Sequence, residues 1–168
     1  MIDNRHCHPD TPTLFLDYDG VLHPDEVYRI GERIVLRMDG FNLFEWAPVL
    51  EELLVPHPEL SIVLSTSWVR LLGFEVARAW LPKGLQERVV GTTWHPHVPS
   101  GWERLPRHEQ VLRDVRKHGR QRWIAIDDDG ADWPTTSRDK LVLTDSLLGL
   151  GVRSAQEELR EKLSSLYR

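Results

Sequence analysis

Apolar residues along this chain gather in short runs that stop abruptly at polar side chains. Three of these runs, 13–16, 61–64 and 123–126, end at aspartates or at a serine. Short aliphatic or β-branched runs with abrupt polar ends are typical of buried parallel strands. Residues 88–90 and 140–143 have the same character and predict two further strands.

Between the runs, apolar residues recur at the three- and four-residue spacing of helices. Pro48 fits the first turn of a helix that Pro56 ends, and a second helix is predicted over 104–118. Ser154 and Glu157 have the spacing of a capping box and predict the start of a third helix. Strands that alternate with helices indicate an α/β fold, in which helices cover both faces of a parallel sheet.

Residues 22–44 depart from this alternation. Two β-prone segments, 27–30 and 33–36, flank Gly31 and predict a hairpin, which we expect to form a flap over the end of the first strand. With 168 residues, the chain has the length of one compact domain with its own core. We expect residues 1–12 to form a flexible N-terminal segment.

Composition and charge narrow the possible functions. A net charge of −5 argues against a general nucleic-acid binder, because neutralising phosphates requires a basic surface. No run of about 18 apolar residues occurs, and the first residues lack the apolar stretch of a secretory signal. We therefore expect a soluble, cytoplasmic protein without a membrane partner. The single cysteine, Cys7, cannot form an internal disulfide, in agreement with a reducing compartment.

Carboxylates concentrate directly after two of the predicted strands. Asp17 and Asp19 follow the first strand, within the segment DYDGVL. Asp127, Asp128 and Asp132 follow a later strand. Loops at the carboxyl ends of the strands form the site in open α/β sheets, so these acids should meet in one crevice. Crowded carboxylates repel one another without a cation, and a set of oxygen ligands suits Mg²⁺.

The motif order strand-DxDG-V-L, strand-Ser/Thr, strand-DD resembles that of the haloacid dehalogenase (HAD) superfamily over about residues 13–150. The segments VLSTSW, RVVG and WIAIDD are also similar to the capless HAD phosphatase-like domains associated with Swiss-army-knife RNA repair proteins. The resemblance implies a Rossmann-like three-layer fold with a central parallel sheet, a short flap after the first strand and no cap domain.

The resemblance also implies roles for the acids. Asp17 would be the nucleophile that forms an aspartyl-phosphate, and Asp19 the general acid and then the base. A Mg²⁺ ion would bridge Asp17, the phosphate and Asp128. Asp132 matches the second acid of the family motif, and Asp127 stands in place of that motif's glycine. The implied metal-binding set is Asp17, Asp19, through its backbone carbonyl, Asp127, Asp128 and Asp132.

Two further phosphate contacts stay open between alternatives. The hydroxyl comes from Ser65, which directly follows the second of the three runs, or from Thr66 if that strand is one residue longer. The family also uses one basic residue, and no lysine has a persuasive position for this role. The leading candidate is Arg107, with Arg104 and Lys117 as the alternatives.

Together these features predict a magnesium-dependent phosphomonoester phosphatase. The segment between Ser65 and Arg107 is too short for a cap domain, so the crevice should stay open to a bulky phosphorylated substrate such as a nucleic-acid end. We expect Trp68 and Trp133 to pack in the core, although a tryptophan near the crevice could stack on a base. The alternative is a catalytically silent HAD-fold module that binds a nucleic acid or a protein through the basic stretch 104–122.

Overall fold

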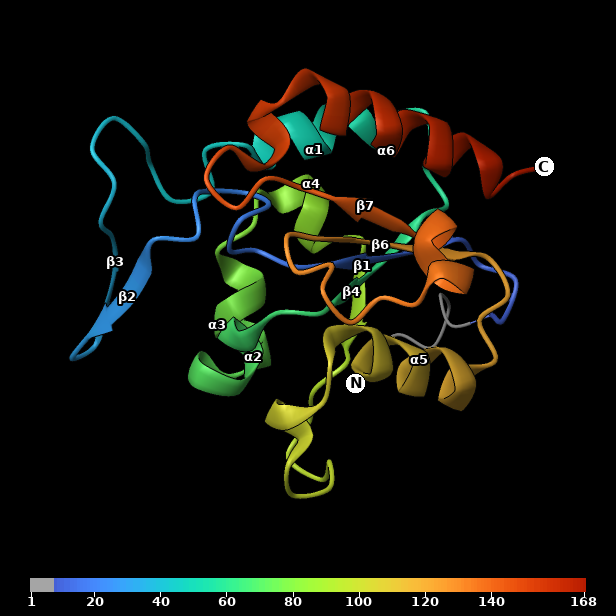
Figure 1. Ribbon diagram of the computed structural model, residues 1–168, viewed down its shortest axis with the longest axis horizontal. Coiled ribbons are helices and arrows are strands. Elements are labelled where there is room, and N and C mark those ends of the chain that lie inside the picture. Colours follow the sequence, from blue (N-terminus) through green and yellow to red (C-terminus); the bar gives the residue numbers. More distant parts are fainter. Residues whose placement is uncertain (1–7) are drawn as a thin grey trace.

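A five-stranded parallel sheet forms the centre of the computed structural model, which describes residues 8–168 (Figure 1). Its order is β5-β4-β1-β6-β7, and helices cover both faces, which confirms the α/β Rossmann-like fold class. Residues 1–7, which include Cys7 and belong to the predicted flexible segment, lie outside the described residues. The strands are β1 (Thr13–Leu16), β4 (Ser61–Leu64), β5 (Val89–Thr92), β6 (Trp123–Asp127) and β7 (Leu141–Leu143).

The register of the sheet decides where the polar residues lie. Leu16 of β1 is level with Leu64 of β4 on one side and with Ile126 of β6 on the other. The residues that follow, Asp17 and Asp127, therefore end neighbouring strands at the same edge of the sheet. This register brings carboxylates together from parts of the chain more than a hundred residues apart.

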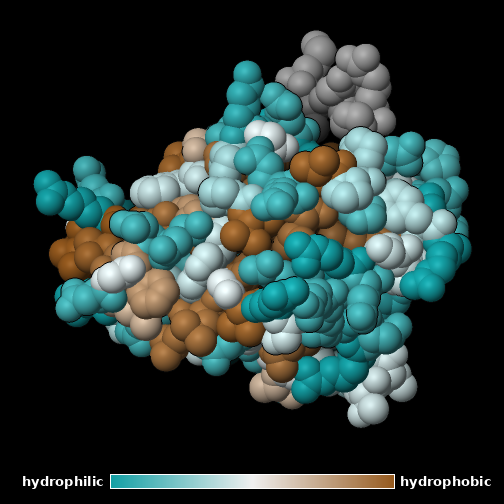
Figure 2. Space-filling view, turned by 90° about the horizontal axis from the view of Figure 1, so that it is seen from above, coloured by the Kyte–Doolittle hydropathy of each residue, from teal (hydrophilic) through white to brown (hydrophobic). Residues whose placement is uncertain are grey.

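Alternating side chains of the central strands face two cores of different size. Leu14 and Leu16 of β1 belong to the larger core, which contains the apolar sides of α1 (Ala47–Leu53) and α6 (Arg153–Ser165). Phe15 points the other way, into a smaller core against Val111 of α5. Figure 2 shows that the outer side of the layer of α1 and α6 is largely hydrophilic over the half where α6 lies. Each fully buried leucine contributes about 1.5–3 kcal/mol to folding, so the larger core dominates the stability of the sheet.

Helix α5 (Arg107–His118) begins three residues later than the sequence predicted. Pro106 is extended at its N-cap, and a proline disfavours the helical conformation of the residue before it, Leu105. Arg104 consequently belongs to a separate 3₁₀ helix, Trp102–Arg104. The C-terminal end is as predicted, since Gly119 caps the helix in the left-handed conformation (φ 63°).

The capping box predicted at the start of α6 is wrong. The helix begins at Arg153, so Ser154 lies inside it, and the N-cap residue is Val152, which makes no side-chain cap. A 3₁₀ helix, Gly149–Gly151, runs directly into α6 and leaves Val152 as the extended residue. Glu157 instead forms an ion pair with Arg153, at 2.9 Å between Oε1 and Nε.

The predicted hairpin forms from β2 (Val27–Ile30) and β3 (Arg33–Leu36) and projects from the body of the protein (Figure 1). Arg29 links it to the body by donating a hydrogen bond to the carbonyl of Leu71, at 3.3 Å. Between β4 and α5, the described chain contains no inserted cap domain. That stretch holds α2 (Ser67–Leu72), α3 (Phe74–Ala79), α4 (Lys83–Gln86), β5 and the 3₁₀ helix before α5.

Two remaining features complete the described part of the chain. A 3₁₀ helix, Thr135–Lys140, leads into β7. The carbonyls of Pro9 and Asp10 accept hydrogen bonds from Gln121 and Arg122, which ties this stretch to the start of β6. None of the helices in residues 8–168 is both long and apolar enough to cross a membrane.

Candidate active site

Three aspartates meet at the carboxyl edge of the sheet. Asp17 and Asp127 lie at the ends of β1 and β6, and Asp128 follows directly. One carboxylate oxygen from each lies within 4.8 Å of the other two. Gly20, with φ at +70°, makes room for this group, because a Cβ there would lie 2.3 Å from Oδ2 of Asp128. The DxDG turn therefore needs glycine to let Asp128 approach.

Arg107 joins two of these acids from the first turn of α5. Its Nη2 lies 3.3 Å from Oδ2 of Asp17, and its Nε lies 3.1 Å from Oδ2 of Asp127. Of the three basic candidates, Arg107 is therefore the one that the structure brings into contact with the acids. Arg104 lines the adjoining pocket, and Lys117 lies near the far end of α5, on a different cavity.

The electrostatics of this cluster favour an additional cation. Burial raises the pKa of Asp17 to about 6; the Arg107 guanidinium opposes this shift and the Asp19 carboxylate adds to it. Burial, together with the charges of Asp17 and Asp25, raises the pKa of Asp128 to about 7. The pKa of Asp127 is also raised, mainly by burial and then by Asp17. One arginine is therefore not enough to bring the pKa values of the buried Asp17 and Asp127 and the half-buried Asp128 back to the ordinary range of an aspartate.

Asp19 has very different surroundings from Asp17. Its Oδ1 accepts hydrogen bonds from Nε2 of His23, at 3.0 Å, and from Nε1 of Trp68, at 2.9 Å. Nδ1 of His23 accepts a hydrogen bond from the backbone N–H of Phe44, at 3.2 Å. This assigns the proton of the neutral ring to Nε2, which donates it to Asp19. Both donors occupy the same oxygen, and Oδ2 has no hydrogen-bond partner among residues 8–168.

An aromatic cluster holds these two donors in place. His23 is fully buried and packs at 4.9 Å from the ring of Phe44, which packs edge-on against Trp68 at 5.2 Å. Phe44 is the one non-glycine residue with positive φ (57°) in the described chain. Such backbone strain persists only where the surroundings over-determine it, and here it accompanies the N–H that fixes the ring of His23. Trp68 and Trp133 are both buried, as core residues are.

The two candidate hydroxyls are placed differently. Thr66 lines the pocket beside the cluster, and its side chain lies close enough to Asp17 to act to lower the pKa of that acid. Ser65 is buried, and its Oγ has no hydrogen-bond partner among the described residues. The structure therefore brings Thr66, rather than the favoured Ser65, into contact with Asp17. The strand itself ends at Leu64, and Thr66 is the N-cap of α2.

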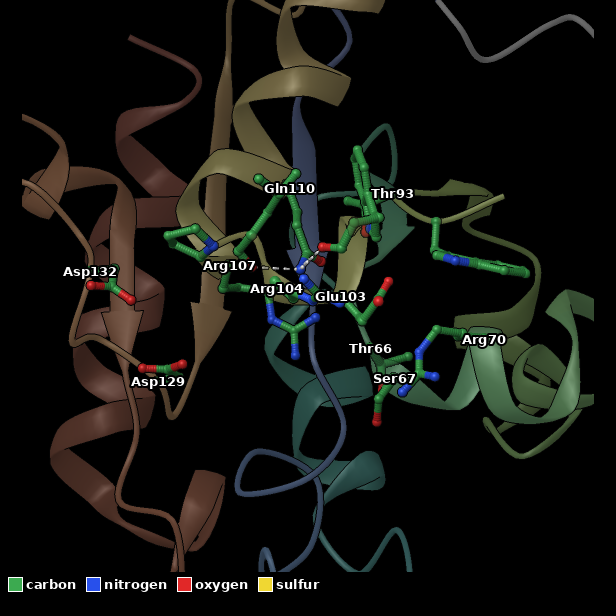
Figure 3. Close-up of a pocket in the computed structure, with 14 residues that line it drawn as sticks. Thr66, Ser67, Arg70, Thr93, Glu103, Arg104, Arg107, Gln110, Asp129 and Asp132 are labelled. Carbon is green, nitrogen blue, oxygen red and sulfur yellow. Dashed lines mark hydrogen bonds between the residues drawn. The ribbon is translucent and has the colours of Figure 1, made fainter. Parts of the chain in front are cut away.

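Asp132 does not join the acidic cluster, although the sequence predicted it as a metal ligand there. It is exposed and lines the same pocket as Asp129, across from Ser67 and Arg70 (Figure 3). The acids of residues 8–168 that could together hold a metal are Asp17, Asp127 and Asp128. The four-residue spacing does not return the chain to the cluster, because the segment after β6 turns outward instead of continuing as a helix.

Sequence reasoning missed three contributors to this site. His23 stands four residues after Asp19, a spacing with no recognised meaning outside a helix. Thr144, after β7, donates a hydrogen bond from its hydroxyl to the carbonyl of Gly20, at 2.7 Å. Asp25 lies close enough to raise the pKa of Asp128. Thr144 and Asp25 reach the site only through tertiary packing, so no local sequence signal could have identified them.

Comparison with known proteins gives one match. Neither the search of curated proteins nor the search of solved structures found a similar protein. A family model described as "HAD domain in Swiss Army Knife RNA repair proteins" matches residues 13–155. HAD domains support hydrolase or phosphatase chemistry in general and typically use a metal ion, which agrees with the acidic cluster. Because the match spans most of the sequence, the chain belongs to this family of HAD domains.

Proposed function

We propose that the protein is a magnesium-dependent phosphomonoester phosphatase that works through an aspartyl-phosphate on Asp17. The observation that carries this proposal is that two acids of one short turn, Asp17 and Asp19, have different surroundings. Asp17 lies against Arg107 and two further aspartates, whereas Asp19 is held by two neutral donors with Oδ2 free. Two carboxylates in contrasting environments suit a nucleophile and a general acid.

The donor set fits a hard divalent cation. Asp17, Asp127 and Asp128 offer only carboxylate oxygens within 4.8 Å of one another, which is the ligand type that magnesium selects. Asp127 already forms an ion pair with Arg107 and accepts a hydrogen bond from the N–H of Asp129, so Asp17 and Asp128 are the more available ligands. Magnesium bound there would offset the negative charge of the phosphate and of the cluster.

The chain's own residues then divide the reaction between them. An oxygen of Asp17 attacks phosphorus, and the bond from phosphorus to the leaving oxygen breaks. Asp19, protonated at Oδ2, gives its proton to that oxygen. In the second half, Asp19 takes a proton from a water molecule that attacks the aspartyl-phosphate, which releases inorganic phosphate and restores both acids. Arg107 and Thr66 orient Asp17 and face the phosphate oxygens.

The site suits a bulky phosphomonoester. The described chain has no inserted domain that could close over the acids, and its hairpin projects from the body (Figure 1). A pocket of about 280 Å³ adjoins the cluster. We therefore propose that the substrate is a large molecule with a terminal phosphate, such as a nucleic-acid end.

The test is phosphate release from nitrophenyl phosphate, nucleoside monophosphates, 3′- and 5′-phosphorylated oligonucleotides and phosphopeptides, with magnesium or with a chelator. Wild type should release phosphate only with magnesium. Asp17→Asn should lower kcat by roughly 10³-fold or more, because the amide cannot act as the nucleophile.

Asp139→Asn also replaces an aspartate with an asparagine, but at an exposed position outside the cluster. It serves as the control and should keep wild-type activity. Full activity in chelator would contradict the role of magnesium. Activity of Asp17→Asn close to wild type would remove Asp17 from the chemistry. Absence of release from the whole panel, with phosphorylated oligonucleotides still bound, would favour the silent binding module instead.

A further inference from the structure

The pocket beside the acidic cluster is placed to receive the rest of the substrate. It encloses about 280 Å³, at the lower end of ligand-sized cavities. Thr66 and Arg107 line it, and both also contact Asp17. A phosphate that reacts with Asp17 therefore leaves the group attached to it in or beside this pocket.

Two arginines of this pocket lack partners within the described chain. Arg70 of α2 and Arg104 of the 3₁₀ helix are exposed, and their guanidinium groups form no ion pair or hydrogen bond with residues 8–168. Figure 3 shows both side chains directed towards the opening that Thr66 and Ser67 border. A guanidinium group matches the geometry of a phosphate, with which it can form two parallel hydrogen bonds.

The other arginines of the neighbouring helix contrast with this pair. Arg113 and Arg116 both form ion pairs with Glu109, and Arg120 is buried against Asp114 at 2.8 Å. Most of the arginines in the basic stretch 104–122 are therefore engaged in contacts within the protein. Arg104 and Lys117 have no ion pair within the described chain; Arg104 lines this pocket, whereas Lys117 lines a separate cavity.

An aromatic side chain completes the lining. Trp94 follows β5, is half-buried and lines the pocket together with the buried Trp102. A partly exposed tryptophan beside arginines offers a surface for a flat ring, and a base stacked on an aromatic side chain is a common mode of single-strand recognition. Trp102 packs under Arg113, at 5.6 Å, and so belongs to the wall of the pocket.

Acids on the opposite wall restrict where a phosphate can lie. Figure 3 shows Asp129 and Asp132 across from Arg70. Glu103 stands next to Arg104 and is exposed. An anionic backbone is consequently repelled by Asp129 and Asp132 and attracted to Arg70 and Arg104, and Glu103 offsets part of the attraction beside Arg104.

We propose that this pocket binds the nucleotide next to the terminal phosphate of a nucleic-acid strand. Arg70 and Arg104 hold its phosphodiester, and Trp94 stacks on its base. The inference rests on the proposed function, since it takes the reacting phosphate to lie at Asp17. A phosphopeptide fits less well, because its one phosphate would already be at Asp17 and both arginines would need other anions.

The test compares kcat/KM for nitrophenyl phosphate with kcat/KM for a phosphorylated oligonucleotide. Arg70→Gln and Arg104→Gln should each lower the oligonucleotide-to-nitrophenyl phosphate ratio by roughly tenfold, as expected for loss of a charge-assisted hydrogen bond. An oligonucleotide with a neutral methylphosphonate at the linkage next to the terminal phosphate should lower the wild-type ratio by a similar factor. With this substrate, Arg70→Gln and Arg104→Gln should lower the ratio little further.

Two control variants separate electrostatics from damage to the fold. Arg160→Gln, the same change on the exposed face of α6, should keep the wild-type ratio. Glu103→Gln should raise the ratio, because it removes a negative charge from the pocket. An equal loss on both substrates in Arg70→Gln and Arg104→Gln, or a larger loss on phosphopeptides than on oligonucleotides, would overturn the proposal.

Binding distinguishes failure of this inference from failure of the proposed function. The probe is a fluorescent oligonucleotide with a terminal phosphate, titrated with Asp17→Asn and with the same protein carrying Arg70→Gln or Arg104→Gln. Each arginine lost should weaken binding and lower the salt slope by about one. This result would support the pocket even if wild type hydrolysed no substrate, whereas unchanged binding would overturn it even in an active phosphatase.

Discussion

Asp17 and Asp19 are separated by one residue, yet the protein gives them opposite surroundings. Asp17 is almost fully buried among charges: Arg107 on one side and two further carboxylates on the other. Asp19 is partly exposed and rests on neutral donors from His23 and Trp68, inside an aromatic cluster. A turn of three residues therefore spans a charged region and an apolar region.

This difference explains how two equal side chains can do different chemistry. The nucleophile must be ionised and near cations, which the charged side supplies. The general acid must present one oxygen and exchange a proton, which the apolar side supports by fixing Oδ1 and leaving Oδ2 open. The spacing of the motif brings the two acids together, but their neighbours give each its role.

The largest expected effect that tests this contrast comes from Asp19→Asn. Without a proton donor, hydrolysis of poor leaving groups such as nucleoside monophosphates should fall by roughly 10²–10⁴-fold. Nitrophenyl phosphate, whose leaving group needs no proton, should be affected much less. Steady-state rates on both substrates measure this, and equal losses on the two would show that Asp19 is not the general acid.

On the charged side, Arg107→Gln should cost stability as well as activity. The buried carboxylates of Asp17 and Asp127 would lose the cation that pairs with them, so the free energy of unfolding at pH 8 should fall by about 2–4 kcal/mol. The loss should be smaller at pH 5.5, where the carboxylates can neutralise themselves by taking up protons. Denaturant unfolding at both pH values measures it. Arg116→Gln, on the exposed side of the same helix, is the matched control, and an equal loss there would contradict this account.

The raised pKa values predict how pH affects the metal-free protein. Asp17 (about 6) and Asp128 (about 7) hold protons more tightly in the folded chain than the ordinary value of 3.8 allows. Stability from this source is complete below about pH 4 and is lost progressively as pH rises from there through the folded-state pKa values of about 6 and 7, by about 1–3 kcal/mol for Asp17.

Unfolding in chelator from pH 4 to 8 measures this loss, taken as the difference between wild type and Asp17→Asn. That difference isolates Asp17 from the histidines, which titrate in the same range. Asp139→Asn should keep the wild-type slope. A wild type that gains stability relative to Asp17→Asn as pH rises would show that Asp17 is not stabilised in its neutral form.

The smallest effect should come from the positioning residue of the apolar side. His23→Leu removes one of the two donors to Asp19 and should lower kcat on nucleoside monophosphates by roughly tenfold, the usual effect of losing a hydrogen bond to a charged group. His23→Gln keeps an N–H donor and should recover part of the rate. A purely structural role would lower the rates on nitrophenyl phosphate and on nucleoside monophosphates equally.

The fold could be predicted well because its signals are local. Buried parallel strands are continuous apolar runs, and the hairpin has its turn residues at the right spacing. The start of α5 and the cap of α6 were misjudged because proline and a preceding 3₁₀ helix override the helical pattern. For the site, the spacing DxD and the pair Asp127-Asp128 were visible in the sequence. His23 and Thr144 were not, since the four-residue spacing of His23 from Asp19 has no recognised meaning outside a helix, and Thr144 reaches the site only through a tertiary contact.

The strand that carries Asp17 lies at the centre of the sheet, although in the sequence it precedes its neighbours β4 and β6. Its neighbour β6, with the acids that face Asp17, is made more than a hundred residues later. Thr144, whose hydroxyl holds the carbonyl of Gly20, comes later still. Until β6 has been made, β1 can therefore pair with β4 on one edge only, and the site is incomplete until Thr144 has also been made.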